Sequence, residues 1–158
     1  MKKNTSSEVF EYDGLGFPIT LLNFSLIEIR GVVVPNIDYN VLQKNVLLAL
    51  SSKPHPLTGN EVRFIRQYLQ MTYKEFANRF GVTHAIVIHW EKSKNAFAKI
   101  QPTTELCIRL CILDTLQAKN KLFRDTFRNF NYLDFKAQKN QTPEHITLNS
   151  NTLKGSYL

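Results

Sequence analysis

Residues 71–94 have the sequence MTYKEFANRFGVTHAIVIHWEKSK, and this stretch decides the fold of the region around it. Thr72 followed by Glu75 is a capping box, the Ser/Thr-x-x-Glu pattern whose two side chains satisfy free backbone N–H groups where a helix begins. Gly81 follows the last apolar residue of that helix, where a left-handed residue ends a helix at little cost. Thr83 is a typical N-cap residue for a second helix. The stretch therefore predicts two short helices joined by a tight glycine turn.

The apolar residues of both predicted helices share one face. Phe76 and Phe80 lie four apart in the first helix. Val87 and Trp90 lie three apart in the second, and Ala77 is small where that helix must approach closely. Two helices packed in this way form a helix-turn-helix unit, whose second helix can enter the DNA major groove. An ordinary helical hairpin uses the same caps and spacing, so the spacing alone leaves both interpretations open.

The flanking sequence indicates a mainly α protein. Residues 1–13 are polar and are expected to be loose, whereas residues 19–34 are rich in β-branched side chains and predict a small β-hairpin. Helical spacing predicts helices at residues 39–51, 59–70, 73–80, 84–92, 102–117 and 120–135.

The expected domain boundary is the stiff segment Lys53-Pro54-His55-Pro56. Residues 1–56 are predicted to form the hairpin and one helix, which make dimer or partner contacts. Residues 57–136 are predicted to form a five-helix domain. Residues 137–158 are polar and are expected to be a disordered tail.

Positive charge is concentrated in the predicted helical region. The chain has 20 Lys and Arg residues against 13 Asp and Glu, a formal net charge of +7. Residues 1–57 are neutral, whereas residues 58–99 and 119–139 each carry +4. This distribution favours a polyanionic partner, although charge alone also fits a solvated basic surface.

A longer pattern then resembles a known family. Arg66-x5-Thr72-x2-Glu75-Phe76-Ala77-x3-Gly81-Val82-Thr83-x3-Val87-x2-Trp90-Glu91-Lys92 is similar to the Cro/CI (XRE) helix-turn-helix family over about residues 58–116. Residues 57–66, LTGNEVRFIR, look like the opening of the DNA-binding half of MqsA-type antitoxins. The resemblance implies a Cro/CI-type helix-turn-helix domain in a dimeric bacterial regulator, located in the cytoplasm at the nucleoid.

The resemblance also implies roles for individual residues. Arg66 and Glu91 are expected to form a structural ion pair between two helices. The residues themselves, two β-branched apolar side chains on either side of inward-facing Val87, favour contact of Ile86 with thymine methyl groups, whereas Ile88 fits packing or a dimer contact equally well. The residues expected to face DNA are Thr72, Tyr73, Thr83, His84, Ala85, Ile86, Ile88, His89, Lys92 and Lys94.

The sequence departs from the family at two places. Tyr73 stands where the family usually has a Gln that contacts phosphate, and a phenol can still donate to phosphate. Residues 1–57 contain no cysteine, so the zinc ribbon of MqsA-type proteins is absent and no metal is expected.

Other candidate sites are better explained by structural roles. Cys107 and Cys111 are four apart in a helical pattern and are expected to pack in the core. Phe123, Phe127 and Phe130 form a stripe that predicts contact with helix 102–117, with a dimer interface or a membrane-surface helix as alternatives.

The functional expectation follows from these observations. No catalytic motif, cofactor loop or membrane-spanning run is found, so neither an enzyme nor a membrane protein is expected. The sequence predicts a homodimeric transcriptional autorepressor that binds an inverted-repeat operator in double-stranded DNA. The alternative is a protein-interaction module, an antitoxin that neutralises a toxin protein and for which DNA binding is secondary.

Overall fold

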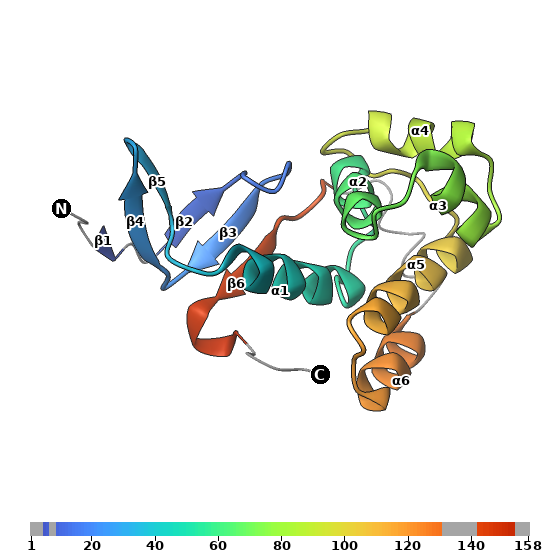
Figure 1. Cartoon of the computed structure of the whole chain (residues 1–158). Coiled ribbons are helices and arrows are strands. Elements are labelled where there is room, and N and C mark those ends of the chain that lie inside the picture. The colour runs from blue at the N-terminus through green and yellow to red at the C-terminus, as the bar shows by residue number, and fades with distance from the viewer. Residues whose placement is uncertain (1–4, 7–8, 131–141, 154–158) are drawn as a thin grey trace. The chain divides into compact units, whose positions relative to one another are not determined.

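The computed structural model describes residues 5–6, 9–130 and 142–153, which form two compact units (Figure 1). The first unit contains the described residues up to residue 46 together with residues 145–153. The second unit runs from residue 47 to residue 144. None of the helices among the described residues has the length and apolar character needed to cross a membrane.

The first unit contains two small sheets. One has the strand order β1-β4-β5 and the other has the order β2-β3-β6. All pairs are antiparallel except β3 with β6, which run parallel. The strands are β1 (Thr5–Ser6), β2 (Val9–Tyr12), β3 (Ile19–Leu22), β4 (Ser25–Ile29), β5 (Val32–Pro35) and β6 (Ile146–Asn149).

The predicted hairpin is formed by β4 and β5. Ile29 pairs with Val32 across a two-residue turn made of Arg30 and Gly31, which have φ values of 51° and 80°. Positive φ at both central residues is typical of the turn that matches the twist of a hairpin. The neighbouring strand β3 pairs with β2 and β6 instead, so residues 19–34 are divided between two sheets.

Two expectations for the ends of the chain are wrong. Residues 137–158 were expected to be disordered, but β6 and the following 3-10 helix (Ser150–Thr152) are ordered parts of the first unit. Ile146 and Leu148 are buried beside their β3 partners Ile19 and Leu21, and this long-range pairing stabilises a segment of polar composition. Strand β2 likewise orders residues 9–12. Residues 131–141 and 154–158 lie outside the described residues.

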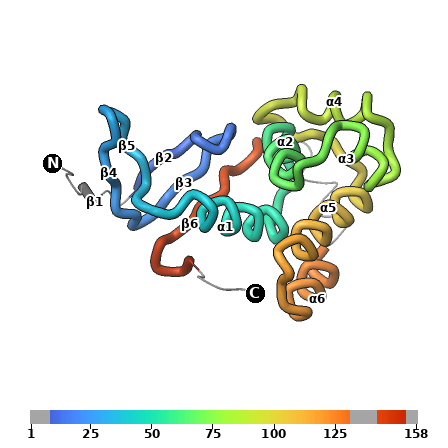
Figure 2. Tube along the Cα trace, in the orientation of Figure 1, coloured from blue at the N-terminus to red at the C-terminus, as the bar shows by residue number. Residues whose placement is uncertain are grey.

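The predicted helices are confirmed where the structure describes them. The described residues contain six α-helices, and the first five end within two residues of the predicted positions. The sixth was predicted to run to residue 135, but it ends at Asn129 because Phe130 takes an extended conformation. Figure 2 follows the second unit from green α2 to orange α6. The helices are α1 (Tyr39–Ser51), α2 (Gly59–Tyr68), α3 (Tyr73–Phe80), α4 (His84–Lys92), α5 (Pro102–Thr115) and α6 (Asn120–Asn129).

The core of the second unit brings α2–α5 together. Helix α4 packs on both α2 and α3, and α5 packs on α3 and α6. The side chains that fill this core are large and apolar, as expected for closely packed helices. Its most completely buried members include Leu57, Ile65, Phe76, Ile108, Ile112 and Leu113.

Two predicted core positions of the later helices are corrected. Cys111 on α5 is buried as expected, but Cys107 is exposed because it lies on the outer side of the same helix. Phe127 on α6 is 63% exposed, and no residue of α6 is buried. Phe123 and Phe130 are half-buried. The predicted core contact of this aromatic stripe is therefore wrong for Phe127.

Candidate nucleic-acid interface

Helix α3 begins and ends as its sequence predicts. The Thr72 hydroxyl accepts a hydrogen bond from the Glu75 backbone N–H at 3.1 Å, and the Glu75 carboxylate accepts one from the Thr72 N–H at 3.0 Å. Gly81 ends the helix with a φ of 70°. The Val82 N–H then donates to the Ala77 carbonyl at 3.0 Å, which closes the turn toward α4.

Helix α4 has one buried face and one exposed face. Its N-cap Thr83 accepts a hydrogen bond from the Ile86 N–H at 3.4 Å. Val87 and Trp90 are buried, as predicted, and Ile88 is half-buried. The residues of the expected DNA-facing set that are exposed here are Thr83, His84, Ala85, Ile86, His89 and Lys92.

The predicted ion pair fixes α4 against α2. The guanidinium of Arg66 donates from Nε to Glu91 Oε1 at 2.9 Å and from NH2 to Glu91 Oε2 at 3.4 Å. Its NH1 also donates to the Met71 carbonyl at 3.0 Å. Both charged side chains are almost entirely buried, so the structure confirms this pair as an internal element.

Arg66 also holds Tyr73, the residue that departs from the family pattern. The guanidinium carbon lies 4.1 Å from the centroid of the Tyr73 ring, a distance typical of a cation–π contact. Tyr73 stays exposed at the first position of α3. The Arg66 side chain therefore links the α2–α4 ion pair to an aromatic ring at the start of α3.

Gly59 allows a close approach that sequence reasoning missed. A Cβ atom at this position would lie 2.5 Å from the Trp90 carbonyl oxygen and 2.7 Å from the Lys94 backbone nitrogen. The Asn60 N–H donates to the Lys94 carbonyl at 2.8 Å, so the end of α4 and its following loop are attached to the first turn of α2. The available signal was Thr58-Gly59-Asn60-Glu61, because Thr58 and Glu61 form a second capping box.

Exposed basic side chains lie at the C-terminal end of α4 and on the adjacent helix α3. Lys92 is exposed in the last turn of α4, and Lys94 is exposed in the loop that follows, with a φ of 51°. Lys74 is exposed on α3, which packs on α4, whereas the Arg79 side chain of α3 interacts with the Cys111 thiol of α5. An exposed helix with lysines at and just beyond its C-terminal end and a further lysine on the adjacent helix is electrostatically suited to a polyanion.

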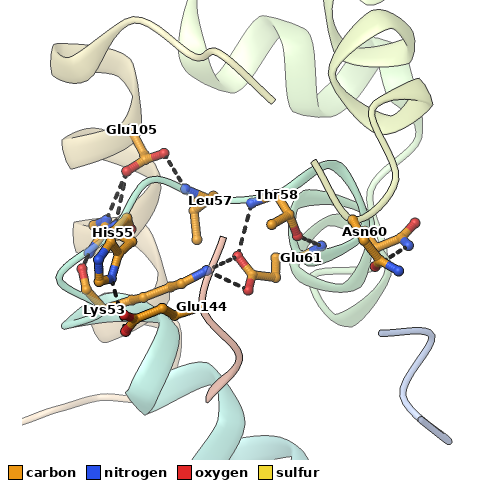
Figure 3. A network of polar contacts seen from close by, with 10 residues as sticks. Lys53, His55, Leu57, Thr58, Asn60, Glu61, Glu105 and Glu144 are labelled. Atoms are coloured by element: carbon orange, nitrogen blue, oxygen red, sulfur yellow. Dashed lines mark hydrogen bonds and ion pairs between the residues drawn. The ribbon is translucent and has the colours of Figure 1, made fainter. Parts of the chain in front are cut away.

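A buried network of charged side chains holds the segment before α2 in place (Figure 3). The Lys53 ammonium lies 2.7 Å from one Glu61 carboxylate oxygen and 2.9 Å from the other. Glu61 accepts the Thr58 N–H at 2.9 Å, and Glu105 accepts the Leu57 N–H at 2.8 Å. The segment before α2 is thus attached to both α2 and α5.

Glu105 and Arg109 complete that network. Arg109 donates to the Glu105 carboxylate from Nε at 3.2 Å and from NH2 at 3.0 Å, and it also donates to the carbonyls of Lys53 and His55. Burial raises the pKa of Glu105, while Arg109 and the Leu57 N–H act in the opposite direction. The Nδ1 atom of His55 lies 3.6 Å from Oε2 of Glu144. These contacts explain why the predicted linker at residues 53–56 belongs to the second unit and why the expected boundary at residue 56 differs from the observed one.

No protein-family model, curated protein or solved structure matches the chain. Within the described ranges, no group of three or more His, Cys, Asp or Glu side chains is placed to hold a metal ion.

Proposed function

We propose that the protein is a sequence-specific regulator of transcription that binds double-stranded DNA through a Cro/CI-type helix-turn-helix domain. The single observation that carries this proposal is the exposed outer face of α4, on a helix held from behind by the Arg66–Glu91 pair. A reading helix must present side chains to base edges while the rest of the domain fixes its position.

The surrounding residues fit contacts with the DNA backbone. Thr72 and Tyr73 are at the start of α3, where the N–H groups that the capping box does not engage and the helix dipole favour phosphate. Lys92 is the last residue of α4 and Lys94 lies in the loop that follows, so both carry positive charge at this end of the exposed face. Such contacts position a protein on DNA without reading its sequence.

The resemblance to MqsA-type antitoxins extends the proposal to the biological unit. The protein acts as a cytoplasmic homodimer at the nucleoid and represses its own promoter. Two-fold symmetry requires an inverted-repeat operator whose half-site centres are about 34 Å apart. The resemblance that supports this extension covers about residues 58–116 together with the opening at residues 57–66, and the dimer is part of the proposal.

The experiment is a binding titration with the DNA directly upstream of the gene and with random duplex, repeated over a range of salt concentrations. Preferential binding of the promoter DNA supports the proposal. With six to eight phosphates contacted, log K should fall against log salt with a slope of about −5 to −7. Equal and weak binding of both duplexes would reject it.

Lys92→Ala tests the backbone contact within the same titration. The variant should bind promoter and random DNA more weakly by the same factor and should reduce the salt slope by about one. Lys121→Ala removes an exposed lysine from α6 and is the matched control. An unchanged slope for Lys92→Ala would place this residue away from the phosphates.

The β4–β5 hairpin favours a second function, binding of a protein partner such as a toxin. Ile29, Val32 and Val33 lie near its turn and are 51%, 61% and 44% exposed. Clustered exposed apolar side chains on a β-hairpin are typical of an interaction surface. Co-expression with a small reading frame adjacent to the gene tests this function. Val32→Glu should abolish co-purification of that product while leaving promoter binding unchanged.

A further inference from the structure

We infer that α4 reads its operator chiefly through the C5-methyl groups of thymine, which Ile86 contacts in the major groove. The inference rests on the proposed DNA-binding function and names the feature of the DNA that this site recognises. Its basis is the unusual composition of the exposed face of α4.

The first two turns of this face lack the side chains that usually read purines. Arg and Lys make paired hydrogen bonds with guanine, and Asn and Gln make them with adenine. None of these four residue types occurs between Thr83 and His89. The face instead presents one hydroxyl, two imidazoles and two apolar side chains, and a thymine methyl group is the apolar feature of the major groove.

Ile86 is the apolar side chain best placed for this contact. It precedes two other β-branched residues: Val87 is completely buried and Ile88 is half-buried, whereas Ile86 is 41% exposed. Of the three residues Ile86, Val87 and Ile88, Ile86 is therefore the one whose side chain is exposed, in the first turn of the helix.

Local structure also limits the freedom of Ile86. Its backbone N–H donates to the Thr83 hydroxyl, so it belongs to the capped and ordered start of α4. A β-branched side chain in a helix has one strongly preferred χ1 rotamer. Little side-chain entropy is lost when such a residue contacts a ligand, which suits an exposed apolar group to recognition.

The charge on the two helices favours DNA over a protein as the partner that Ile86 contacts. An apolar patch on a protein-binding surface is usually bordered by mixed polar residues. The exposed charges of the two packed helices include Lys74 on α3 and Lys92 at the end of α4, whereas Glu75 is engaged in the α3 capping box. An apolar contact on a surface with exposed lysines matches a methyl group that lies between two phosphate backbones.

The test uses a base change that removes only the methyl group. The preferred duplex is first selected from a random pool, and its thymines are then replaced by deoxyuridine, one pair of symmetric positions at a time. Burying one methyl-sized group is worth about fourfold in affinity, so a dimer should lose about 15-fold at one symmetric pair. The remaining thymines should tolerate the replacement.

Ile86→Ala supplies the matched protein variant. It should bind the thymine duplex about as weakly as the wild type binds the uracil duplex, and it should be insensitive to the replacement. Because Ile86 is exposed, thermal unfolding should be nearly unchanged, which separates a lost contact from a lost fold. His89→Ala is the control, because it changes the same face and should keep the full sensitivity to uracil.

The outcomes separate this inference from the function on which it rests. Selection that yields no preferred duplex would reject the proposed function, and the inference with it. A preferred duplex that tolerates uracil at every position would overturn the inference alone. Equal uracil sensitivity in Ile86→Ala and in the wild type would do the same, since it would trace the effect to DNA shape.

Discussion

The Arg66 guanidinium binds both carboxylate oxygens of Glu91 and at the same time stacks on the Tyr73 ring. One side chain of α2 therefore contacts the last turn of α4 and the first turn of α3. In the proposed function, these are the helix that reads bases and the helix end that contacts phosphate. The pair thus couples the position of α4 to that of the start of α3.

Breaking this pair from one side should destabilise the fold. Glu91→Ala leaves the Arg66 charge buried without its partner and should lower the free energy of unfolding by about 3 kcal/mol, measured by urea denaturation. Lys92→Ala, on the adjacent exposed residue, should change it by less than about 0.5 kcal/mol. The double variant Arg66→Met/Glu91→Leu should lose less unfolding free energy than the sum of the losses of Arg66→Met alone and Glu91→Leu alone. Additive losses would contradict direct coupling.

Gly59 and Gly81 are required for different reasons. Gly59→Ala places a Cβ against backbone atoms of the α4 end and should lower the free energy of unfolding by about 1–3 kcal/mol. Gly81 has open space around it but a φ of 70°, so Gly81→Ala should cost about 1–2 kcal/mol through strain. Asn accepts positive φ and should restore stability at residue 81 but not at residue 59. Rescue by Asn at residue 59 would contradict the steric argument.

Glu105 should make stability depend on pH. Its pKa in the folded protein is raised by burial above the ordinary value of 4.5, so the folded state holds this proton more tightly than the unfolded chain. The resulting stabilisation is complete below about pH 4.5 and is lost as pH rises through the raised pKa. As pH rises from about 4 to about 8, the wild type should therefore lose unfolding free energy relative to Glu105→Gln. A shift in favour of the wild type would mean that Arg109 outweighs burial.

The two thiols should differ in reactivity. Cys107 is exposed, whereas burial raises the pKa of the Cys111 thiol and lowers its thiolate fraction. Iodoacetamide at about pH 8 should modify Cys107 first in the folded protein, and both thiols after unfolding in urea. Peptide mass spectrometry measures the two rates. Equal rates in the folded protein would place Cys111 at the surface.

Local sequence signals predicted the centre of the second unit well. Thr72, Glu75, Gly81 and Thr83 act within three or four residues of their partners, and such caps depend little on the rest of the chain. Helical periodicity also located Val87 and the other inward-facing residues. Periodicity does not reveal which faces a neighbour covers, and for this reason Phe127 was wrongly assigned to a core contact.

Contacts between distant parts of the sequence were the main source of error. Strand β6 gains its order from β3, whose residue Ile19 pairs with Ile146. Neither short segment reveals its partner, because alternating burial over four residues occurs in many sequences. Gly59 is a similar case, since its need to be small comes from Trp90 and Lys94 rather than from its own turn.

The pairing of β3 with β6 has a consequence for synthesis on the ribosome. About 120 residues separate the two strands, so translation at about 5–20 residues per second leaves β3 without β6 for about 6–25 s. Residues 47–144 emerge during that interval, so the second unit is complete before the first. An N-terminal unit that finishes last reverses the usual order of domain folding, and a chain released early would present the unpaired edge of β3 to its neighbours.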